Sequence, residues 1–250
     1  MCGIAGKVSF YSPPLIETVE KMTEKLAHRG PDNGSICQID QFAVFGHRRL
    51  SIIDIADRSN QPMQDNSKRY TIVYNGEVNN FLELNKILKE HRYAFKTNSD
   101  TEFVLYSYIH WGVNCFNKFN GMYAIAIWDK VEKTLILARD RFGKKPLYYC
   151  LLNNEITFAS ELSAILVDQK INSSKSVSIT GLNHYLAMGY ILSPNTIYSE
   201  IKKIEPASYA IFKNEGHIQK SVYWKYIDYF YLNIALNESK LINNIFKSKC

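Results

Sequence analysis

The chain has 250 residues, of which 46% are hydrophobic and 22% charged, with a formal net charge of +6. This composition is ordinary for a globular protein with one large domain or two small ones. The positive charge is spread along the chain without a run of five or six like charges, which argues against a nucleic-acid-binding arm. No apolar run approaches the ~20 residues that a membrane span requires.

The cysteines lie far apart, and no pair has the spacing of metal ligands. They stand at positions 2, 37, 115, 150 and 250. An odd number of scattered cysteines favours a reducing compartment. The N-terminus lacks a basic stretch followed by an apolar core, so we expect no signal peptide. The sequence therefore predicts a cytoplasmic protein without a metal site.

The first half of the chain alternates strand-like and helix-like segments. Strands are predicted over 1–11, 42–46 and 70–74. Apolar residues at helical spacing predict helices over 15–26 and 81–88, and a third that begins near 98–102 with Ser99 or Asp100 as N-cap. The strand over 70–74 is expected to stop at the sequence NGE, residues 75–77.

The second half begins with a meander of strands separated by polar turns. These strands are predicted over 121–128, 134–138, 147–151 and 156–159. Helices are expected over 162–166, 180–188 and 238–246, and a late hairpin over 207–212 and 217–223. Irregular alternation with antiparallel strands favours an α+β fold, with helices covering sheets, over a doubly wound parallel sheet.

The start of the chain, MCGIAG, places a cysteine directly behind the initiator methionine. If Met1 is removed, Cys2 carries both a thiol and a free α-amine. The thiol is a nucleophile as its thiolate, and the amine has a pKa of about 7.7–8.0 in model peptides, which suits a general base. The alternative is that Cys2 is a small buried residue at the start of a strand.

Six short motifs occur in one order along the chain: MCGIAG at 1–6, HRGPD at 28–32, RLSI at 49–52, NGE at 75–77, SDTE at 99–102 and RDRFG at 139–143. Together they resemble the glutaminase domain of class II glutamine amidotransferases, in particular that of glutamine-hydrolysing asparagine synthetases. The resemblance extends over roughly residues 1–225. It implies an N-terminal-nucleophile hydrolase fold, an αββα sandwich of two antiparallel sheets with helices outside.

The resemblance also implies a reaction centred on Cys2. Its thiolate would attack the side-chain carboxamide of glutamine, and water would release glutamate from the resulting thioester. Asn75 and Gly76 suit the oxyanion, because an amide side chain and an adjacent backbone N–H can converge on one oxygen. Gly76 would also let the chain turn there. Taken alone, Asn-Gly is more typical of a hairpin turn, and only the other motifs favour the oxyanion role.

Two charged residues would hold the ends of the substrate. Arg49 can pair with the α-carboxylate of glutamine and Asp100 with its α-ammonium. The family further implies contacts from the backbone near Ile52 and Ile53 and from the region of Glu77. For Arg49 or Asp100 in isolation, a surface charge or a helix cap is the alternative interpretation.

Two other motifs receive supporting roles. The resemblance implies no general-base role for His28, and the segment 28–32 is expected to order a loop beside the active site. Arg139 and Asp140 are expected to form a buried ion pair that supports a sheet.

The domain prediction places the glutaminase domain at 1–214, followed at 215–250 by the linker and first helix of a truncated synthetase domain. No glycine-rich phosphate loop occurs in this sequence, so no cofactor is expected for the glutaminase part. ATP and magnesium are expected only for the missing synthetase domain. The expected partners are glutamine as substrate and, as a further candidate, a synthetase domain in trans, with neither nucleic acid nor membrane.

The favoured interpretation is the N-terminal glutaminase part of an asparagine synthetase. Another class II amidotransferase, which modifies amino sugars or glycans, is the first alternative. A non-catalytic glutamine-sensing module would keep Arg49 and Asp100 but would not need a free N-terminal cysteine. A nonfunctional product of a shortened gene is the third alternative.

Overall fold

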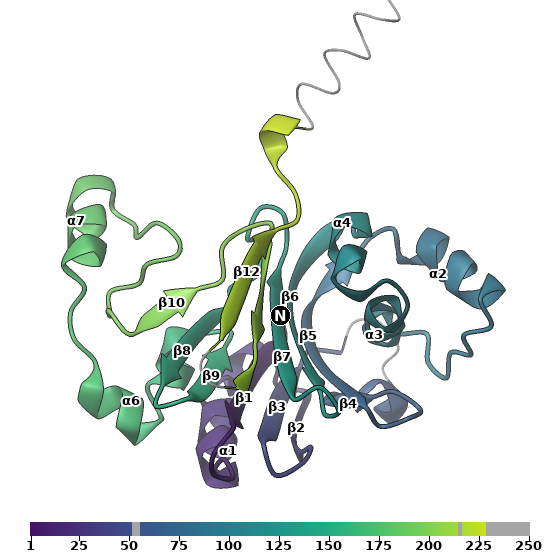
Figure 1. The fold of residues 1–250 in the computed structure, drawn as a ribbon, viewed down its shortest axis with the longest axis horizontal. Coiled ribbons are helices and arrows are strands. Elements are labelled where there is room, and N and C mark those ends of the chain that lie inside the picture. The colour runs from purple at the N-terminus through teal and green to yellow at the C-terminus, as the bar shows by residue number, and fades with distance from the viewer. Residues whose placement is uncertain (52–55, 215–216, 229–250) are drawn as a thin grey trace, which may run out of the picture.

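The fold is a sandwich of two six-stranded antiparallel sheets with helices on its outer faces (Figure 1). The structure is a computed structural model that describes residues 1–51, 56–214 and 217–228. The predicted α+β class and the αββα sandwich are confirmed. The predicted helix over 238–246 and the residues Ile52 and Ile53 lie outside the described residues.

The first sheet has β1 near its centre, and its order is β10-β8-β9-β1-β3-β2. Its strands are β1 (Gly3–Ser9), β2 (Asn33–Gln38), β3 (Ala43–Arg49), β8 (Tyr148–Leu152), β9 (Glu155–Ala159) and β10 (Ile201–Lys203). Strands β1 and β3 run antiparallel, with Gly3 opposite Arg48. The first residues of the chain therefore lie beside the end of β3.

The second sheet has the order β12-β11-β7-β6-β5-β4. Its strands are β4 (Met63–Gln64), β5 (Tyr70–Val78), β6 (Gly121–Asp129), β7 (Thr134–Arg139), β11 (Ser208–Phe212) and β12 (Ile218–Val222). Strands β11 and β12 pair with each other, so the predicted boundary after residue 214 falls within one hairpin of this sheet. The division into two domains stays a prediction.

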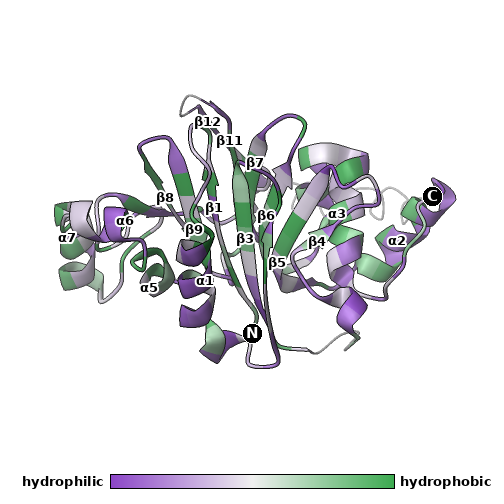
Figure 2. Cartoon of the chain, turned by 90° about the horizontal axis from the view of Figure 1, so that it is seen from below, coloured by the Kyte–Doolittle hydropathy of each residue, from purple (hydrophilic) through white to green (hydrophobic). Residues whose placement is uncertain are grey.

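The main core lies between the two sheets, where side chains from both inner faces meet. Ile4 and Val8 of β1 contribute from the first sheet, and Val73 and Trp128 contribute from the second. Successive side chains of a strand point to opposite faces, so Ile4 and Val8 of β1 and Val73 of β5 enter this core from one face of each strand. Figure 2 shows hydrophobic residues along the strands and hydrophilic residues along helix α1.

Helices cover the outer face of each sheet. Helices α1 (Ile16–Lys25), α5 (Leu162–Ile165) and α6 (Gln169–Ser174) lie on the side of the first sheet, where Met22, Leu26 and Ile165 are buried. Helices α2 (Phe81–Glu90), α3 (Asp100–Trp111) and α4 (Cys115–Lys118) cover the second sheet (Figure 1). Helix α7 (Ile179–Met188) follows α6. Among the described residues, every helix falls short of the length and apolar character needed to cross a bilayer.

The prediction that a strand stops at residue 75 is wrong. Strand β5 continues through the NGE sequence to Val78, and Asn75 and Gly76 pair with Ala124 and Tyr123 of β6. The hairpin-turn interpretation of Asn75-Gly76 is therefore also wrong, because the neighbouring strand β6 holds these residues in an extended conformation.

Candidate active site

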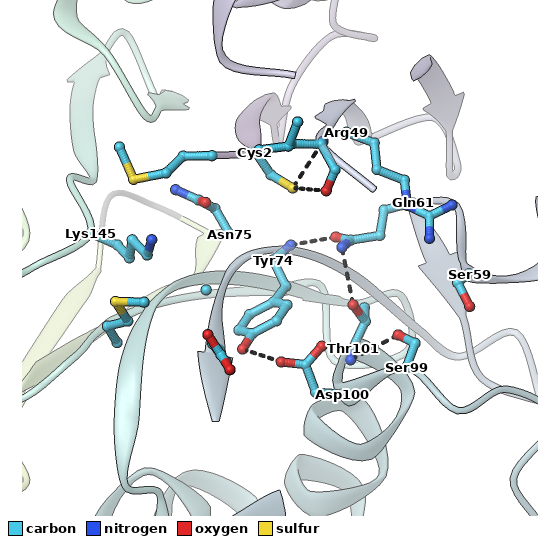
Figure 3. Close-up of a pocket in the computed structure, with 15 residues that line it drawn as sticks. Cys2, Arg49, Ser59, Gln61, Tyr74, Asn75, Ser99, Asp100, Thr101 and Lys145 are labelled. Carbon is cyan, nitrogen blue, oxygen red and sulfur yellow. Dashed lines mark hydrogen bonds between the residues drawn. The ribbon is translucent and has the colours of Figure 1, made fainter. Parts of the chain in front are cut away.

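A pocket of about 240 Å³ opens where the start of β1, the end of β3 and the end of β5 come together (Figure 3). Six of the predicted site residues line it: Cys2, Arg49, Asn75, Gly76, Glu77 and Asp100. They come from both sheets and from the first residue of α3. The fold thus gathers motifs that are far apart in the sequence into one cavity.

Cys2 stands directly before β1 and continues the alternation of side-chain directions along that strand. Because Ile4 and Val8 face the second sheet, Cys2 faces the same way. The backbone N–H of Leu50 donates to its sulfur at 3.4 Å. The Arg29 Nε donates to the Cys2 carbonyl oxygen at 3.1 Å, which fixes the backbone of the residue that carries the thiol.

Asn75 faces Cys2 from the second sheet. Its neighbour Val73 lies in the core between the sheets, so the Asn75 side chain points to that same inner face. The residue is only 2% exposed. Within the described part of the chain, its side-chain nitrogen Nδ2 has no hydrogen-bond partner. A buried amide donor without a partner is costly, and it is available to an oxygen atom of a ligand in the pocket.

The backbone N–H of Gly76 points to the pocket side of β5. In an antiparallel strand, every second N–H points to the same side. The N–H of Tyr74 donates to Gln61 Oε1 at 2.6 Å and that of Val78 to Asp100 Oδ2 at 3.4 Å, both away from β6. Gly76 lies between these two residues, so its N–H points the same way, toward a pocket that Gln61 and Asp100 also line.

The lack of a side chain at Gly76 has a steric reason. A Cβ at this position would lie 2.3 Å from the Met122 carbonyl oxygen and 2.7 Å from the Tyr123 Cα. Both are backbone atoms of β6, which are held by the sheet. The prediction that Gly76 lets the chain turn is wrong, because the residue needs its small size for the close approach of β6.

Asp100 is buried at the start of α3, and the helix cap is Ser99, whose hydroxyl accepts from the Thr101 N–H. The Asp100 carboxylate accepts from the Tyr74 hydroxyl at 2.8 Å. Burial raises the pKa of Asp100, although the hydrogen bond from Tyr74 opposes that shift. Asp100 is therefore not a helix cap, and its carboxylate is oriented by Tyr74 at the wall of the pocket.

Arg49 ends β3 and is buried rather than a surface charge. Its guanidinium Nη1 donates to Asn60 Oδ1 at 2.7 Å and to the Ala56 carbonyl oxygen at 3.2 Å. These contacts hold the guanidinium against the wall of the pocket. Glu77, by contrast, is exposed, and it faces the same side of β5 as Asn75.

Several pocket residues were not found from the sequence. Gln61 joins two elements, because it accepts from the Tyr74 N–H and its Nε2 donates to the Thr101 hydroxyl at 3.1 Å. Lys145, from the loop after β7, also lines the pocket. Nothing in the local sequence around either residue indicates the site, since their places depend on the packing of distant segments.

The segment around His28 lies beside the site. The His28 ring nitrogen Nε2 is 2.9 Å from Glu161 Oε1, and the same carboxylate oxygen accepts from Arg29 Nη1 at 3.0 Å. Hydrogen bonds from Arg29 and His28 lower the pKa of Glu161 even though burial raises it. Glu161 thus holds Arg29 in the orientation in which it binds the Cys2 carbonyl.

The predicted ion pair between Arg139 and Asp140 is wrong. The Arg139 guanidinium donates to three carbonyl oxygens, those of Gly143, Lys145 and Ile204. The Asp140 carboxylate instead accepts backbone N–H groups, including that of Lys145 at 2.9 Å. Both side chains bind backbone groups of the loop after β7, and Arg139 also binds the Ile204 carbonyl, which lies directly after β10.

No group of three or more His, Cys, Asp or Glu side chains within residues 1–51, 56–214 and 217–228 could hold a metal ion. The prediction of a site without a metal stays a prediction. The described cysteines, Cys2, Cys37, Cys115 and Cys150, are free thiols.

A family model described as a glutamine amidotransferase domain matches residues 1–224. This chain belongs to the class II glutamine amidotransferase family. The match covers both sheets and every predicted site residue of the amidotransferase. Its end at residue 224 includes strand β12, which agrees with the pairing of β11 and β12 in one sheet.

Two curated relatives of this amidotransferase are 36% and 35% identical to it over their aligned residues. It is 36% identical over 231 residues to "Asparagine synthetase [glutamine-hydrolyzing] 1" of Bacillus subtilis, covering 90% of this chain and 35% of the relative. It is 35% identical over 247 residues to "Putative asparagine synthetase [glutamine-hydrolyzing] 2" of Methanocaldococcus jannaschii, covering 92% and 47%. The chain thus spans between a third and a half of the length of these relatives.

Solved structures agree on the fold of the amidotransferase. The glutamine phosphoribosylpyrophosphate amidotransferase from B. subtilis, complexed with ADP and GMP, matches with a TM-score of 0.63 at 18% identity. The match covers 89% of this chain and 49% of that one. At this identity the likeness concerns the fold alone.

Proposed function

We propose that this chain hydrolyses the side-chain amide of glutamine, with Cys2 as nucleophile after removal of Met1. One observation carries the proposal: a cysteine sulfur faces Asn75, whose Nδ2 has no hydrogen-bond partner within the described residues, in a pocket also lined by Arg49 and Asp100. Hydrolysis of an amide needs a nucleophile, a base, donors for the oxyanion and a grip on the substrate. This pocket contains a candidate for each.

The two charged residues would bind the amino-acid end of glutamine. The Arg49 guanidinium presents parallel N–H groups that match the α-carboxylate. The Asp100 carboxylate would pair with the α-ammonium, and the Tyr74 hydroxyl keeps that carboxylate in place. Requiring both charges would reject simple amides. Ile52, Ile53 and Glu77 stay proposed as further contacts.

The reaction would then follow in two halves. The Cys2 thiolate attacks the carboxamide carbon, a C–S bond forms, and the carbonyl electron pair moves onto the oxygen. Asn75 Nδ2 and the Gly76 N–H donate to this oxyanion. The α-amine of Cys2, which has taken the proton of the thiol, delivers that proton to the nitrogen. The carbonyl re-forms, the C–N bond breaks, and ammonia leaves a thioester. Water hydrolyses the thioester to glutamate and restores the thiol, so glutamine and water give glutamate and ammonia.

We further propose that the chain is the glutaminase part of an asparagine synthetase. The names of the relatives and their greater length support this assignment. The ammonia would then amidate aspartate at a synthetase domain, in cis or in trans, which would need ATP and magnesium. The glutaminase steps use neither. A cytoplasmic location belongs to the same proposal.

The test measures glutamate and ammonia released from glutamine by the chain, with Cys2→Ala as the variant and Cys37→Ala as the matched cysteine control. We expect Cys2→Ala to lose activity to background and Cys37→Ala to keep it. Full activity in Cys2→Ala would contradict the proposal. Calorimetric binding of glutamine without any hydrolysis by the wild type would instead favour a glutamine-sensing module.

A further inference from the structure

The side-chain amide of Gln61 joins two elements of the pocket wall. Gln61 is 6% exposed and lines the pocket, in the segment that leads into β4. Its Oε1 accepts the Tyr74 N–H at 2.6 Å, and its Nε2 donates to the Thr101 hydroxyl at 3.1 Å (Figure 3). Tyr74 directly precedes Asn75, and Thr101 directly follows Asp100. The amide therefore connects the chain beside the proposed oxyanion donor to the chain beside the proposed contact of the α-ammonium.

The orientation of this amide follows from its partners. A backbone N–H only donates, so the atom that faces Tyr74 is the amide oxygen, and the amide nitrogen faces the Thr101 hydroxyl. The first contact supplies a buried N–H with an acceptor where β4 does not reach, because β4 pairs with β5 only at Thr71 and Ile72. The second contact, to α3, is not needed for that purpose and calls for a reason of its own.

The segment that carries Gln61 is held by the first sheet. The Ser35 hydroxyl of β2 donates to the Gln61 carbonyl oxygen. The Arg49 guanidinium at the end of β3 donates to Asn60 Oδ1 at 2.7 Å. The same sheet carries Cys2 directly before β1. Gln61 therefore fixes the start of α3 relative to both sheets.

Asn75 and Asp100 depend on Gln61 to different degrees. Strand β5 is paired with β6 over its whole length, which keeps Asn75 in place. Asp100 lies outside the sheets, and its carboxylate is held by the Tyr74 hydroxyl at 2.8 Å. The contact between Gln61 and Thr101 adds a second connection from β5 to the start of α3. We therefore expect the loss of Gln61 to move Asp100 rather than Asn75.

We propose that Gln61 is a positioning residue, which holds Asp100 at the distance from Asn75 that the two ends of glutamine require. In the proposed function, Asn75 binds the carboxamide oxygen and Asp100 binds the α-ammonium. The span between these two side chains then selects the substrate by the separation of its amide and its amino group. This role rests on the proposed function.

The test replaces Gln61 with Met, which has a similar length and forms neither hydrogen bond. Gln64→Met is the matched control, because Gln64 also donates to a threonine hydroxyl, that of Thr71 at 3.3 Å, but is exposed. Thr101→Val removes only the connection to α3, and Thr101→Ser keeps a hydroxyl. Circular dichroism checks the fold of each variant, and Thr101→Val decides the test if Gln61→Met does not fold.

The readout is the steady-state hydrolysis of glutamine, with glutaramate as a competitor. Glutaramate is glutamine without its α-amino group, so Asp100 has no ammonium to bind. We expect Gln61→Met and Thr101→Val to raise KM for glutamine about five- to tenfold and to lower kcat less than about threefold. The inhibition constant of glutaramate should change less than about twofold. Gln64→Met and Thr101→Ser should match the wild type.

A double variant tests whether Gln61 acts through Asp100. If it does, adding Gln61→Met or Thr101→Val to Asp100→Asn should change KM less than about twofold further, although each single variant raises it. Additive effects, or an equal loss of affinity for glutamine and glutaramate, would overturn the role of Gln61, because either would indicate a general disturbance of the pocket. An unchanged KM in the folded variants would overturn it as well.

The wild type separates this proposal from the function on which it rests. If the wild type hydrolyses glutamine and the variants keep its KM, the role of Gln61 alone is overturned. If the wild type binds glutamine without hydrolysing it, the proposed reaction fails, and Kd values from calorimetry replace KM in the same comparisons. A wild type that neither binds nor hydrolyses glutamine contradicts both proposals.

Discussion

Cys2 and Asn75 face each other from two different sheets. Cys2 directly precedes β1 in the first sheet, and its side chain points to the same face as that of Ile4. Asn75 belongs to β5 in the second sheet, and its side chain points to the same face as that of Val73. Both side chains therefore point into the space between the sheets, at the edge where it opens into the pocket. The proposed nucleophile and the proposed oxyanion donor would therefore keep their geometry without help from a mobile loop, because both stand on or beside rigid strands.

The first prediction concerns the side-chain amide of Asn75. Asn75→Ala should lower kcat for glutamine hydrolysis by about 10²–10³, because loss of one oxyanion donor typically costs that much. KM should change little, since the amide is expected to bind the oxygen most strongly in the transition state. Steady-state kinetics check this, with Asn79→Ala, a nearby exposed asparagine, as control. A large rise in KM with unchanged kcat would assign Asn75 to substrate binding instead.

The second prediction concerns Gly76. Gly76→Ala should lower the free energy of unfolding by about 1–3 kcal/mol, because a Cβ would lie 2.3 Å from the Met122 carbonyl oxygen and force β5 and β6 apart. Activity should fall as well, since Asn75 would move with the strand. Urea denaturation measures the loss of stability.

Gly112→Ala is the matched control for that loss. Gly112 has a φ of +57° and open space around it, so an alanine there is strained by its backbone alone. We expect a loss of about 1–2 kcal/mol with normal glutaminase activity. If Gly76→Ala keeps both full stability and full activity, the close approach of β6 does not explain the glycine.

The third prediction concerns Asp100 and covers both the KM for glutamine and the pH dependence of stability. Asp100→Asn should raise KM for glutamine about 10- to 100-fold, because a charge-assisted hydrogen bond to the α-ammonium contributes about 1.5–3 kcal/mol. The same substitution should raise the free energy of unfolding, although it weakens the binding of glutamine. Burial raises the pKa of Asp100 above its ordinary value of 3.8, so the folded chain holds the proton more tightly than the unfolded chain.

The sign of the pH effect follows from that difference. In the wild type, the stability contributed by protonated Asp100 is fully present below the unfolded pKa and is lost as pH rises through the raised folded pKa. Asp100→Asn removes this loss, so the variant should gain stability over wild type as pH rises. Thermal melts between about pH 4 and 7 check this, and a pH-independent difference would contradict the role of burial.

The fourth prediction concerns His28, whose replacement should change kcat only slightly. His28→Gln should change kcat less than about threefold, because the imidazole is 62% exposed and contacts Glu161 rather than the Cys2 sulfur. Glu161 keeps its contact with Arg29 in this variant. The pH–rate profile should also keep its shape. A loss of several orders of magnitude would instead identify His28 as a general base.

The sequence allowed the residues with distinctive chemistry to be predicted. Cys2, Arg49 and Asp100 stand in motifs whose order indicates one family, and the structure places all three in one pocket. The helices α1 and α3 followed from apolar spacing and from the Ser99 cap. These features depend on local pattern, which a single sequence records.

Other features depend on what lies beside a residue in space. Asn75-Gly76 has the composition of a turn, yet the backbone of β6 keeps it extended. Lys145 and Gln61 belong to loops whose places follow from the packing of two sheets, and neither carries a local signal. The Arg139–Asp140 pair was misassigned for the same reason, since the backbone groups that bind each side chain belong to a folded loop.

The measurement that tests the central claim most directly is the intact mass of the chain, before and after brief reaction with glutamine and an acid quench. We predict that the purified protein lacks Met1 and that the quenched sample gains the mass of one glutamyl group on the N-terminal peptide, on Cys2. Cys2→Ala should show no such gain. An active protein that retains Met1, or a glutamyl group bound at another residue, would contradict the account.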